Sequence, residues 1–223
     1  MALELILSNA RISGDGPPMV DIGVEDGKIA AIGQSLTADC ETLDAGGRLV
    51  STGLIETHIH LDKSRILDRC SPAPNRGSDH MMRVAAVKEA FTVEDVYERA
   101  RQTLEQCIVY GTTHMRTHVE VDPNVGLRGF KALQQLAKDY SWAIDLDLCV
   151  FAQEGMSNVP EADANVVEGL KLNAPVIGGA PKYDADPAAQ IKRVFELSRE
   201  YDVDVDLHLD VGPSADDMDI HLV

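Results

Sequence analysis

The sequence has little of three things: aromatic side chains, basic side chains and paired cysteines. Phe, Trp and Tyr make up only 4% of its 223 residues, and 20 Lys and Arg stand against 37 Asp and Glu, which gives a formal net charge of −17. Because so acidic a chain repels phosphate at long range, we expect no nucleic-acid partner and no membrane partner. The cysteines form no C-x-x-C pair, which favours reduced thiols over a disulfide framework or a zinc ribbon. They are Cys40, Cys70, Cys107 and Cys149.

Long apolar runs are also missing. No stretch reaches the roughly 18–20 uninterrupted apolar residues of a membrane-spanning helix. The N-terminus carries Glu4 and lacks the basic residues of a secretion signal. Hydrophobic residues nevertheless make up 44% of the chain, a proportion typical of globular proteins that bury a core. These features predict a soluble protein of the cytoplasm.

Residues 1–50 have the pattern of a small β unit. Short apolar stretches at 3–8, 22–25 and 29–32 alternate with turn residues, and Asp26-Gly27 is a typical hairpin turn. We therefore expect a separate N-terminal β unit over these residues.

Strand and helix patterns alternate over residues 51–223. Strand candidates lie at 54–61, 113–121, 144–152, 175–179 and 203–210, and helical patterns fill the intervals. This alternation predicts an α/β fold with a parallel sheet covered by helices. A spacing of about 32 residues per unit is that of a (β/α)8 barrel. We expect an incomplete TIM-type barrel of about five strand-helix units, with an open doubly wound sheet as the alternative.

Capping residues mark the starts of two helices. Thr92, with Asp95 three residues later, forms a capping box, and Gly111 follows the expected helix end. Asp186-Pro187 places an N-cap before a proline at the first helical position. Between these two helices, residues 127–138 have an amphipathic pattern.

Two histidines near the end of the first barrel strand form an H-x-H motif. Side chains two residues apart on a strand point to the same face, so His58 and His60 are positioned to bind one metal ion. Neutral imidazole is a common ligand of zinc and iron. An H-x-H motif by itself is often incidental, but the apolar residues before this one and its place at a strand end favour ligands.

The fifth strand candidate alternates strictly between apolar and polar residues. Asp204, Asp206, His208 and Asp210 share one face. The simpler interpretation is an edge strand with one face in solvent. In a barrel this face would point inward, and His208 would then reach the same ion as the H-x-H motif.

A second polar row lies on the strand candidate at 113–121. Arg116, His118 and Glu120 share a face, either as a solvent-exposed surface or as the lining of a polar cavity in which they pair with one another. Beyond the next strand, Gln153 offers an amide that both donates to and accepts from a polar ring edge.

Taken together, four segments resemble the metal-dependent amidohydrolase superfamily, in its branch of cytosine deaminase and N-isopropylammelide hydrolase-like enzymes. They are residues 53–63 (GLIETHIHLDK), 111–120 (GTTHMRTHVE), 151–155 (FAQEG) and the strand that ends at His208. The resemblance implies a barrel that begins near residue 50, with the N-terminal strands in a β-sandwich-like flank. It also implies hydrolysis of non-peptide C–N bonds with one divalent metal ion, zinc or iron.

The resemblance also assigns roles to individual residues. It makes His58, His60 and His208 the metal ligands, and it places Gln153 and Lys63 at the substrate. The substrate would be a small nitrogen heterocycle such as a pyrimidine or a triazine. The oligomeric state is left open, and a homo-oligomer is one alternative.

The chain departs from this family at the acid/base position. The deaminases carry a glutamate three residues after the strand-five histidine, where this chain has Val211, so the candidate catalytic residue is the nearest carboxylate, Asp210. Another C–N hydrolysis is therefore favoured at least as well as cytosine deamination. The family's histidine on strand six and metal-binding aspartate on strand eight would lie beyond Val223. We expect a truncated barrel that binds metal without turnover, with a non-catalytic remnant that binds a metal or a partner chain as the alternative.

Overall fold

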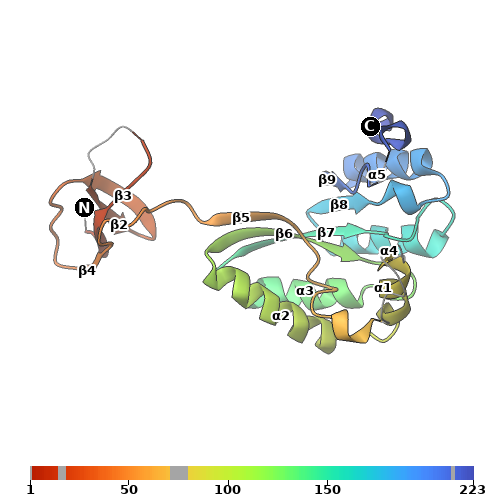
Figure 1. The fold of residues 1–223 in the computed structure, drawn as a ribbon, viewed down its shortest axis with the longest axis horizontal. Coiled ribbons are helices and arrows are strands. Elements are labelled where there is room, and N and C mark those ends of the chain that lie inside the picture. Colours follow the sequence, from red (N-terminus) through yellow and green to blue (C-terminus); the bar gives the residue numbers. More distant parts are fainter. Residues whose placement is uncertain (1, 15–18, 71–79, 212–213) are drawn as a thin grey trace. The chain divides into compact units, whose positions relative to one another are not determined.

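The chain folds into two compact units, Met1–Gly53 and Leu54–Val223. The computed structural model, drawn in Figure 1, describes residues 2–14, 19–70, 80–211 and 214–223. Among the helices formed by these residues, none is both long enough and apolar enough to cross a membrane.

The first unit is built on a four-stranded sheet in the order β3-β2-β1-β4. Its strands are β1 (Leu5–Ala10), β2 (Val20–Glu25), β3 (Lys28–Gly33) and β4 (Glu41–Asp44). The antiparallel strands β2 and β3 are joined by Asp26 and Gly27, whose φ angles of 53° and 68° are those of a type I′ turn. The predicted hairpin is thus confirmed.

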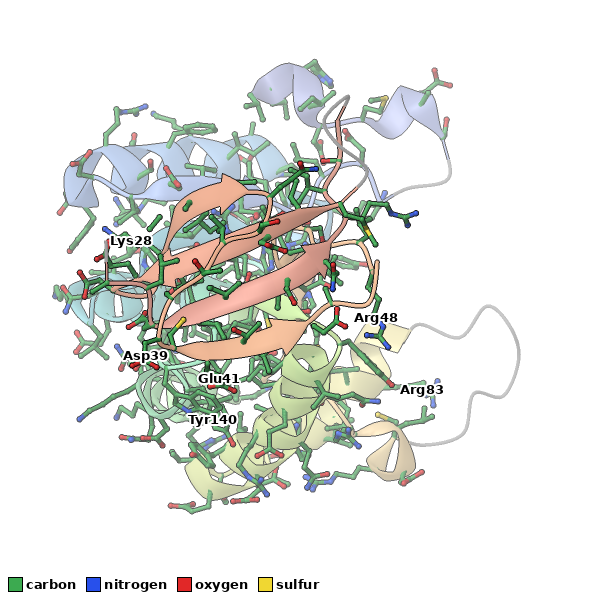
Figure 2. The ribbon with its side chains drawn as sticks, turned by 90° about the vertical axis from the view of Figure 1, so that its left-hand side faces the viewer. Lys28, Asp39, Glu41, Arg48, Arg83 and Tyr140 are labelled. Atoms are coloured by element: carbon green, nitrogen blue, oxygen red, sulfur yellow. The ribbon has the colours of Figure 1, made fainter. Side chains whose placement is uncertain are left out.

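Strand β4 is an addition to the expected strands. It pairs in parallel with β1, and all four of its residues are exposed. Ala10, Val20 and Ile22 form a small core under the sheet. Figure 2 shows the exposed charged side chains of Lys28, Asp39, Glu41 and Arg48 around the margin of this sheet.

The second unit contains a parallel sheet whose spatial order, β5-β6-β7-β8-β9, follows the order of the chain. Its strands are β5 (Leu54–Ile59), β6 (Thr112–Glu120), β7 (Asp145–Phe151), β8 (Val176–Gly179) and β9 (Asp204–Leu207). A doubly wound sheet requires the strand order to reverse, so that alternative is wrong. Strands added successively in one direction curl into part of a barrel (Figure 1), which confirms the predicted partial TIM-type barrel.

Helices connect these strands and cover one face of the sheet. They are α1 (His80–Lys88), α2 (Val93–Val109), α3 (Arg128–Asp139), α4 (Pro160–Lys171) and α5 (Pro187–Tyr201), with short 3-10 turns at Leu67–Arg69, Pro181–Tyr183, Ala215–Asp217 and Ile220–Leu222. The predicted caps are confirmed: the Thr92 hydroxyl accepts a hydrogen bond from the Asp95 amide at 3.1 Å, and the Asp186 carboxylate accepts one from the Ala189 amide at 3.0 Å.

The main core lies between the helices and the sheet. Alternate residues of the strands, among them Val119 and Val150, pack against Leu104, Phe130 and Val194 of the helices, and all five are fully buried. Burial of this apolar surface holds the helices on one face. The strand residues between them point to the opposite face, where the polar side chains are collected.

Candidate metal centre

Four imidazole rings meet on the polar face of the curled sheet. His58 comes from β5 and His60 follows it, His118 lies on β6, and His208 directly follows β9. Every pair of ring centroids lies between 4.1 and 5.6 Å apart, with the rings of His58 and His118 stacked at the shortest separation. The three predicted metal ligands are thus brought together, and a fourth imidazole joins them.

The ring nitrogens have the spacing of ligands on a single ion. The Nε2 atoms of His60 and His208 lie 3.2 Å apart, and two nitrogens each about 2.0–2.1 Å from a tetrahedral zinc ion lie about 3.3 Å apart. One potential ligand atom from each of His58, His118 and His208 lies within 4.8 Å of the others. The cluster therefore offers more than one set of three nitrogen ligands, and the assignment of His58, His60 and His208 as the ligands stays a prediction.

Burial keeps the imidazoles of His60, His118 and His208 neutral. It lowers the pKa of His60 to about 2, helped by the Lys63 ammonium, and it lowers the pKa of His118 to about 4, helped by His58. The pKa of His208 is lowered by burial and by the neighbouring His58 and Lys63. Neutral imidazole is the form that binds metals.

Several ring nitrogens lack a hydrogen-bond partner among the described residues. They are Nδ1 of His60, Nδ1 and Nε2 of His118 and Nδ1 of His208, all of them buried. Buried polar atoms are normally satisfied, so a group of unsatisfied ones needs an explanation. A divalent ion held through Nε2 of His60 and His208 would leave their Nδ1 atoms unsatisfied, but it would satisfy one nitrogen of His118, and the imidazoles present fit such an ion.

Small side chains on the intervening strands allow β6 and β9 to face each other. The two strands are separated in the sheet by β7 and β8, yet Nε2 of His118 lies 3.4 Å from Oδ1 of Asp206. Between them lie Cys149 and Gly178, and a Cβ on Gly178 would meet the Asp206 carbonyl oxygen at 2.7 Å and the Cys149 sulfur at 2.8 Å. The absence of a side chain at position 178 therefore leaves room for the cluster.

The polar row on β6 lines a buried site. His118 and Glu120 are 0% and 1% exposed, so the solvent-exposed interpretation is wrong for them. The Glu120 carboxylate pairs with the ammonium groups of Lys63 and Lys88. Burial by itself would raise the pKa of Glu120, but the two lysines lower it.

Lys88 was not anticipated as part of the site. It is 2% exposed, and its ammonium lies 2.6 Å from Glu120, 3.1 Å from Asp122 and 2.6 Å from Glu154. Burial would lower the pKa of Lys88, but the Glu120 and Asp122 carboxylates hold it above its usual value. A sequence signal did exist, because Lys88 lies four residues after the apolar Val84, which places both side chains on one face of helix α1.

Asp62 joins this network beside the histidines. Its Oδ2 accepts a hydrogen bond from the Glu120 amide at 2.9 Å, and its Oδ1 accepts one from the Lys63 amide at the same distance. Burial and the Glu120 charge raise the pKa of the Asp62 carboxyl. Since Oδ1 also lies 4.0 Å from Nδ1 of His60, the network is directly connected to the cluster.

The predicted substrate residues lie at the carboxyl ends of the strands. Gln153 is 4% exposed and follows β7, while Lys63 follows β5 and already has a partner in Glu120. Asp210, the candidate catalytic carboxylate, accepts a hydrogen bond from the Asp219 amide at 2.6 Å. The side chain of Val211 is 53% exposed. The roles of these residues in catalysis stay predictions.

Known proteins share this architecture. The N-isopropylammelide isopropyl amidohydrolase of Pseudomonas sp. (strain ADP) is 28% identical over 224 residues, which cover 94% of this chain and 54% of that protein. The 5-methylcytosine deaminase of Klebsiella pneumoniae liganded with 5-fluorocytosine superposes with a TM-score of 0.82 at 30% identity, over 92% of this chain and 51% of that one. For the N-isopropylammelide isopropylaminohydrolase of Burkholderia multivorans the TM-score is 0.78 at 27% identity, over 92% and 53%.

The curled parallel sheet is a partial barrel, and its histidine cluster is a candidate metal site. The chain is similar to proteins of the amidohydrolase superfamily, among them an N-isopropylammelide hydrolase and a 5-methylcytosine deaminase, as its motifs predicted. It spans about half the length of the relatives it matches. No family model matches it.

Proposed function

We propose that this chain provides the metal centre of a hydrolase that acts on non-peptide C–N bonds of a small nitrogen heterocycle, such as a pyrimidine or a triazine. The observation that carries the proposal is the meeting of four imidazoles at the ends of β5, β6 and β9, of which that of His118 is fully buried. The names of the relatives, an ammelide hydrolase and a 5-methylcytosine deaminase, support this class of substrate.

Different residues would bind the metal and the substrate. His58, His60 and His208, with His118 beside them, would hold one divalent ion, zinc or iron. A bound ion supplies Lewis acidity and activates water near neutral pH. The buried amide of Gln153 would donate to and accept from the edge of the substrate ring.

Proton transfer is the part of the reaction for which this chain offers least. Val211 has no group that moves a proton, and the Asp210 carboxylate is held by the Asp219 amide. General acid–base catalysis contributes about 10²–10⁴-fold to such reactions. We therefore propose that these 223 residues bind metal without appreciable turnover.

Metal analysis under chelator competition tests the metal centre. We expect the wild-type chain to retain about one zinc or iron ion and the His208→Ala variant to lose it, because removing one imidazole removes one of the ligands. The His221→Ala variant is the matched control, since His221 is exposed in a C-terminal 3-10 turn. A wild-type chain that binds neither metal would refute the proposal.

An ammonia-release assay on pyrimidines and aminotriazines tests turnover separately. We expect metal-loaded protein to release no ammonia above the rate of the His208→Ala variant. Release above that rate would contradict the absence of turnover and would assign the proton transfer to a residue within the chain. Asp210→Asn would then be the first variant to examine.

A second candidate function is a non-catalytic protein that binds a partner chain. Strands β5 and β9 are the edges of the sheet, and Leu54 and Ile55 on β5 are 58% and 69% exposed. Open strand edges with exposed apolar residues pair readily with other chains. Sedimentation of the purified chain distinguishes the two cases, because a stable self-associated or partner-bound species without metal would favour this second function.

A further inference from the structure

The Asp206 carboxylate lies between a cation and an imidazole on the polar face of the sheet. Its Oδ2 accepts a hydrogen bond from Nη1 of Arg116 at 3.1 Å, and its Oδ1 lies 3.4 Å from Nε2 of His118. The Asp206 side chain is 25% exposed, whereas His118 is fully buried. One carboxylate therefore connects Arg116 to the histidine cluster.

A carboxylate beside one ring nitrogen decides which nitrogen of a neutral imidazole carries the proton. Metal-binding histidines almost always donate the N–H that is not used for the metal to a carboxylate, a carbonyl or a water molecule. At His118 the Asp206 carboxylate faces Nε2 at 3.4 Å. At His60 the nearest carboxylate, that of Asp62, faces Nδ1 at 4.0 Å. His118 thus has the closer orienting partner of the two.

Arg116 makes the Asp206 carboxylate a fixed acceptor. The guanidinium pairs with Asp206 at 3.1 Å and lies 3.9 Å from the Asp147 carboxylate on β7. A carboxylate that accepts a hydrogen bond from arginine points in a defined direction. This pairing also offsets the cost of placing a negative charge next to a buried ring.

We infer that Asp206 is a positioning residue of the metal centre, which keeps the His118 proton on Nε2 so that His118 presents its Nδ1 lone pair as an additional metal ligand. The inference rests on the proposed function, because it assigns a role at the same centre. It accounts for the burial of a fourth imidazole in the cluster and for the charged pair that reaches across two intervening strands.

Zinc affinity, measured by competition with a chromophoric chelator, tests the positioning role. We expect Asp206→Ala to weaken zinc binding by about 10–100-fold. Asp206→Asn keeps an acceptor oxygen without the charge, so its loss should be smaller. Asp204→Ala is the matched control, because Asp204 precedes Asp206 by two residues on the same strand and is exposed; its affinity should stay within about twofold of wild type.

The tautomer of His118 gives a second readout that a merely structural role would not change. In zinc-free protein, long-range ¹H–¹⁵N spectra should show His118 protonated at Nε2, with its signals identified by their loss in His118→Gln. In Asp206→Ala this preference should disappear. Protonation of His118 at Nδ1 in the wild-type chain, or wild-type zinc affinity in Asp206→Ala, would overturn the inference.

The same measurements distinguish a variant that fails to fold from a failure of the proposed function. If Asp206→Ala does not fold, the Asp206→Asn affinity and the wild-type tautomer decide the question. If the wild-type chain binds no zinc, the proposed function fails, while the tautomer of His118 still reports whether Asp206 holds its proton.

Discussion

At the scale of single residues, the unusual feature is a lysine buried among carboxylates. Lys88 faces Glu120, Asp122 and Glu154, Lys63 pairs with Glu120 as well, and Asp62 lies next to them. A buried charge is tolerated only when partners replace the water it has lost. The ammonium of Lys88 has three such partners, so the strands and helix α1 that carry them depend on it.

Lys88→Met should therefore destabilise the second unit. The substitution keeps the apolar stem but leaves buried carboxylates without their cation, and breaking a buried pair in this way costs about 3–5 kcal/mol. Lys192→Met is the control, because Lys192 is 78% exposed with a 3.9 Å ion pair along its helix, worth about 0.5 kcal/mol or less. Urea unfolding measures both. Equal stability of the two variants would contradict a structural role for Lys88.

A second buried carboxylate, Asp184, ties two loops together. It accepts hydrogen bonds from the amides of Met156, Ser157 and Asp186, from the Ser157 hydroxyl and from the Gln190 side chain at 2.8 Å. Burial would raise the pKa of Asp184, but these hydrogen bonds outweigh it and lower the pKa below its ordinary value.

The lowered pKa of Asp184 predicts a pH dependence of stability. Because the folded pKa lies below the unfolded value of about 3.9, the stabilisation is complete above that pH and is lost as the pH falls through the folded pKa. The difference in unfolding free energy between wild type and Asp184→Ala should be constant near neutral pH and shrink below about pH 4. Denaturant unfolding between pH 3 and 7 measures it. A difference that grows on acidification would contradict the assignment.

At the scale of elements, the histidine cluster depends on how closely strands β7, β8 and β9 approach one another. Gly178 on β8 lies between Cys149 and Phe151 of β7 and Asp206 of β9, and an added Cβ would meet them at 2.7 to 3.2 Å. One of these contacts is with the backbone of β9, which cannot rotate away. The approach of β9 to β6 therefore requires a residue without a side chain on β8.

Gly178→Ala should separate the two sides of the cluster. Overpacking of this kind costs about 1–3 kcal/mol, and we expect zinc affinity to fall with stability because Asp206 and His208 lie on the displaced side. Gly33→Ala is the control, since a Cβ there meets only the Leu36 side chain at 3.5 Å. Thermal melting and zinc titration measure both effects. Unchanged zinc affinity in Gly178→Ala would show that the cluster tolerates the displacement.

Elements with local signals were predictable and those without them were not. The helix caps at Thr92 and Asp186 and the Asp26-Gly27 turn depend on neighbouring residues, and the structure confirms them. Strand β4 has four exposed residues and no apolar alternation. It forms because β1 offers backbone hydrogen-bonding groups, a partner from a distant part of the chain.

At the scale of the whole molecule, the division into two compact units predicts that metal acts on one of them. Zinc at about 100 times its dissociation constant stabilises the folded form by about 2.7 kcal/mol. Hydrogen exchange should therefore slow at β5, β6 and β9 and stay unchanged at β1 to β4. His208→Ala, examined with and without zinc, serves as the control. Equal protection of both sheets would contradict the prediction that metal acts on the second unit alone.

The sequence by itself determined which residues share a strand face, because side chains alternate along every strand whatever surrounds it. That periodicity placed His58, His60 and His208 on polar faces and, with the motifs, indicated the superfamily. Only the tertiary structure decided that His118 joins these three, that Asp206 reaches it from β9, and that Lys88 neutralises Glu120. These contacts join distant parts of the chain. They depend on the curl of the sheet and on the room left at Gly178, which no local pattern specifies.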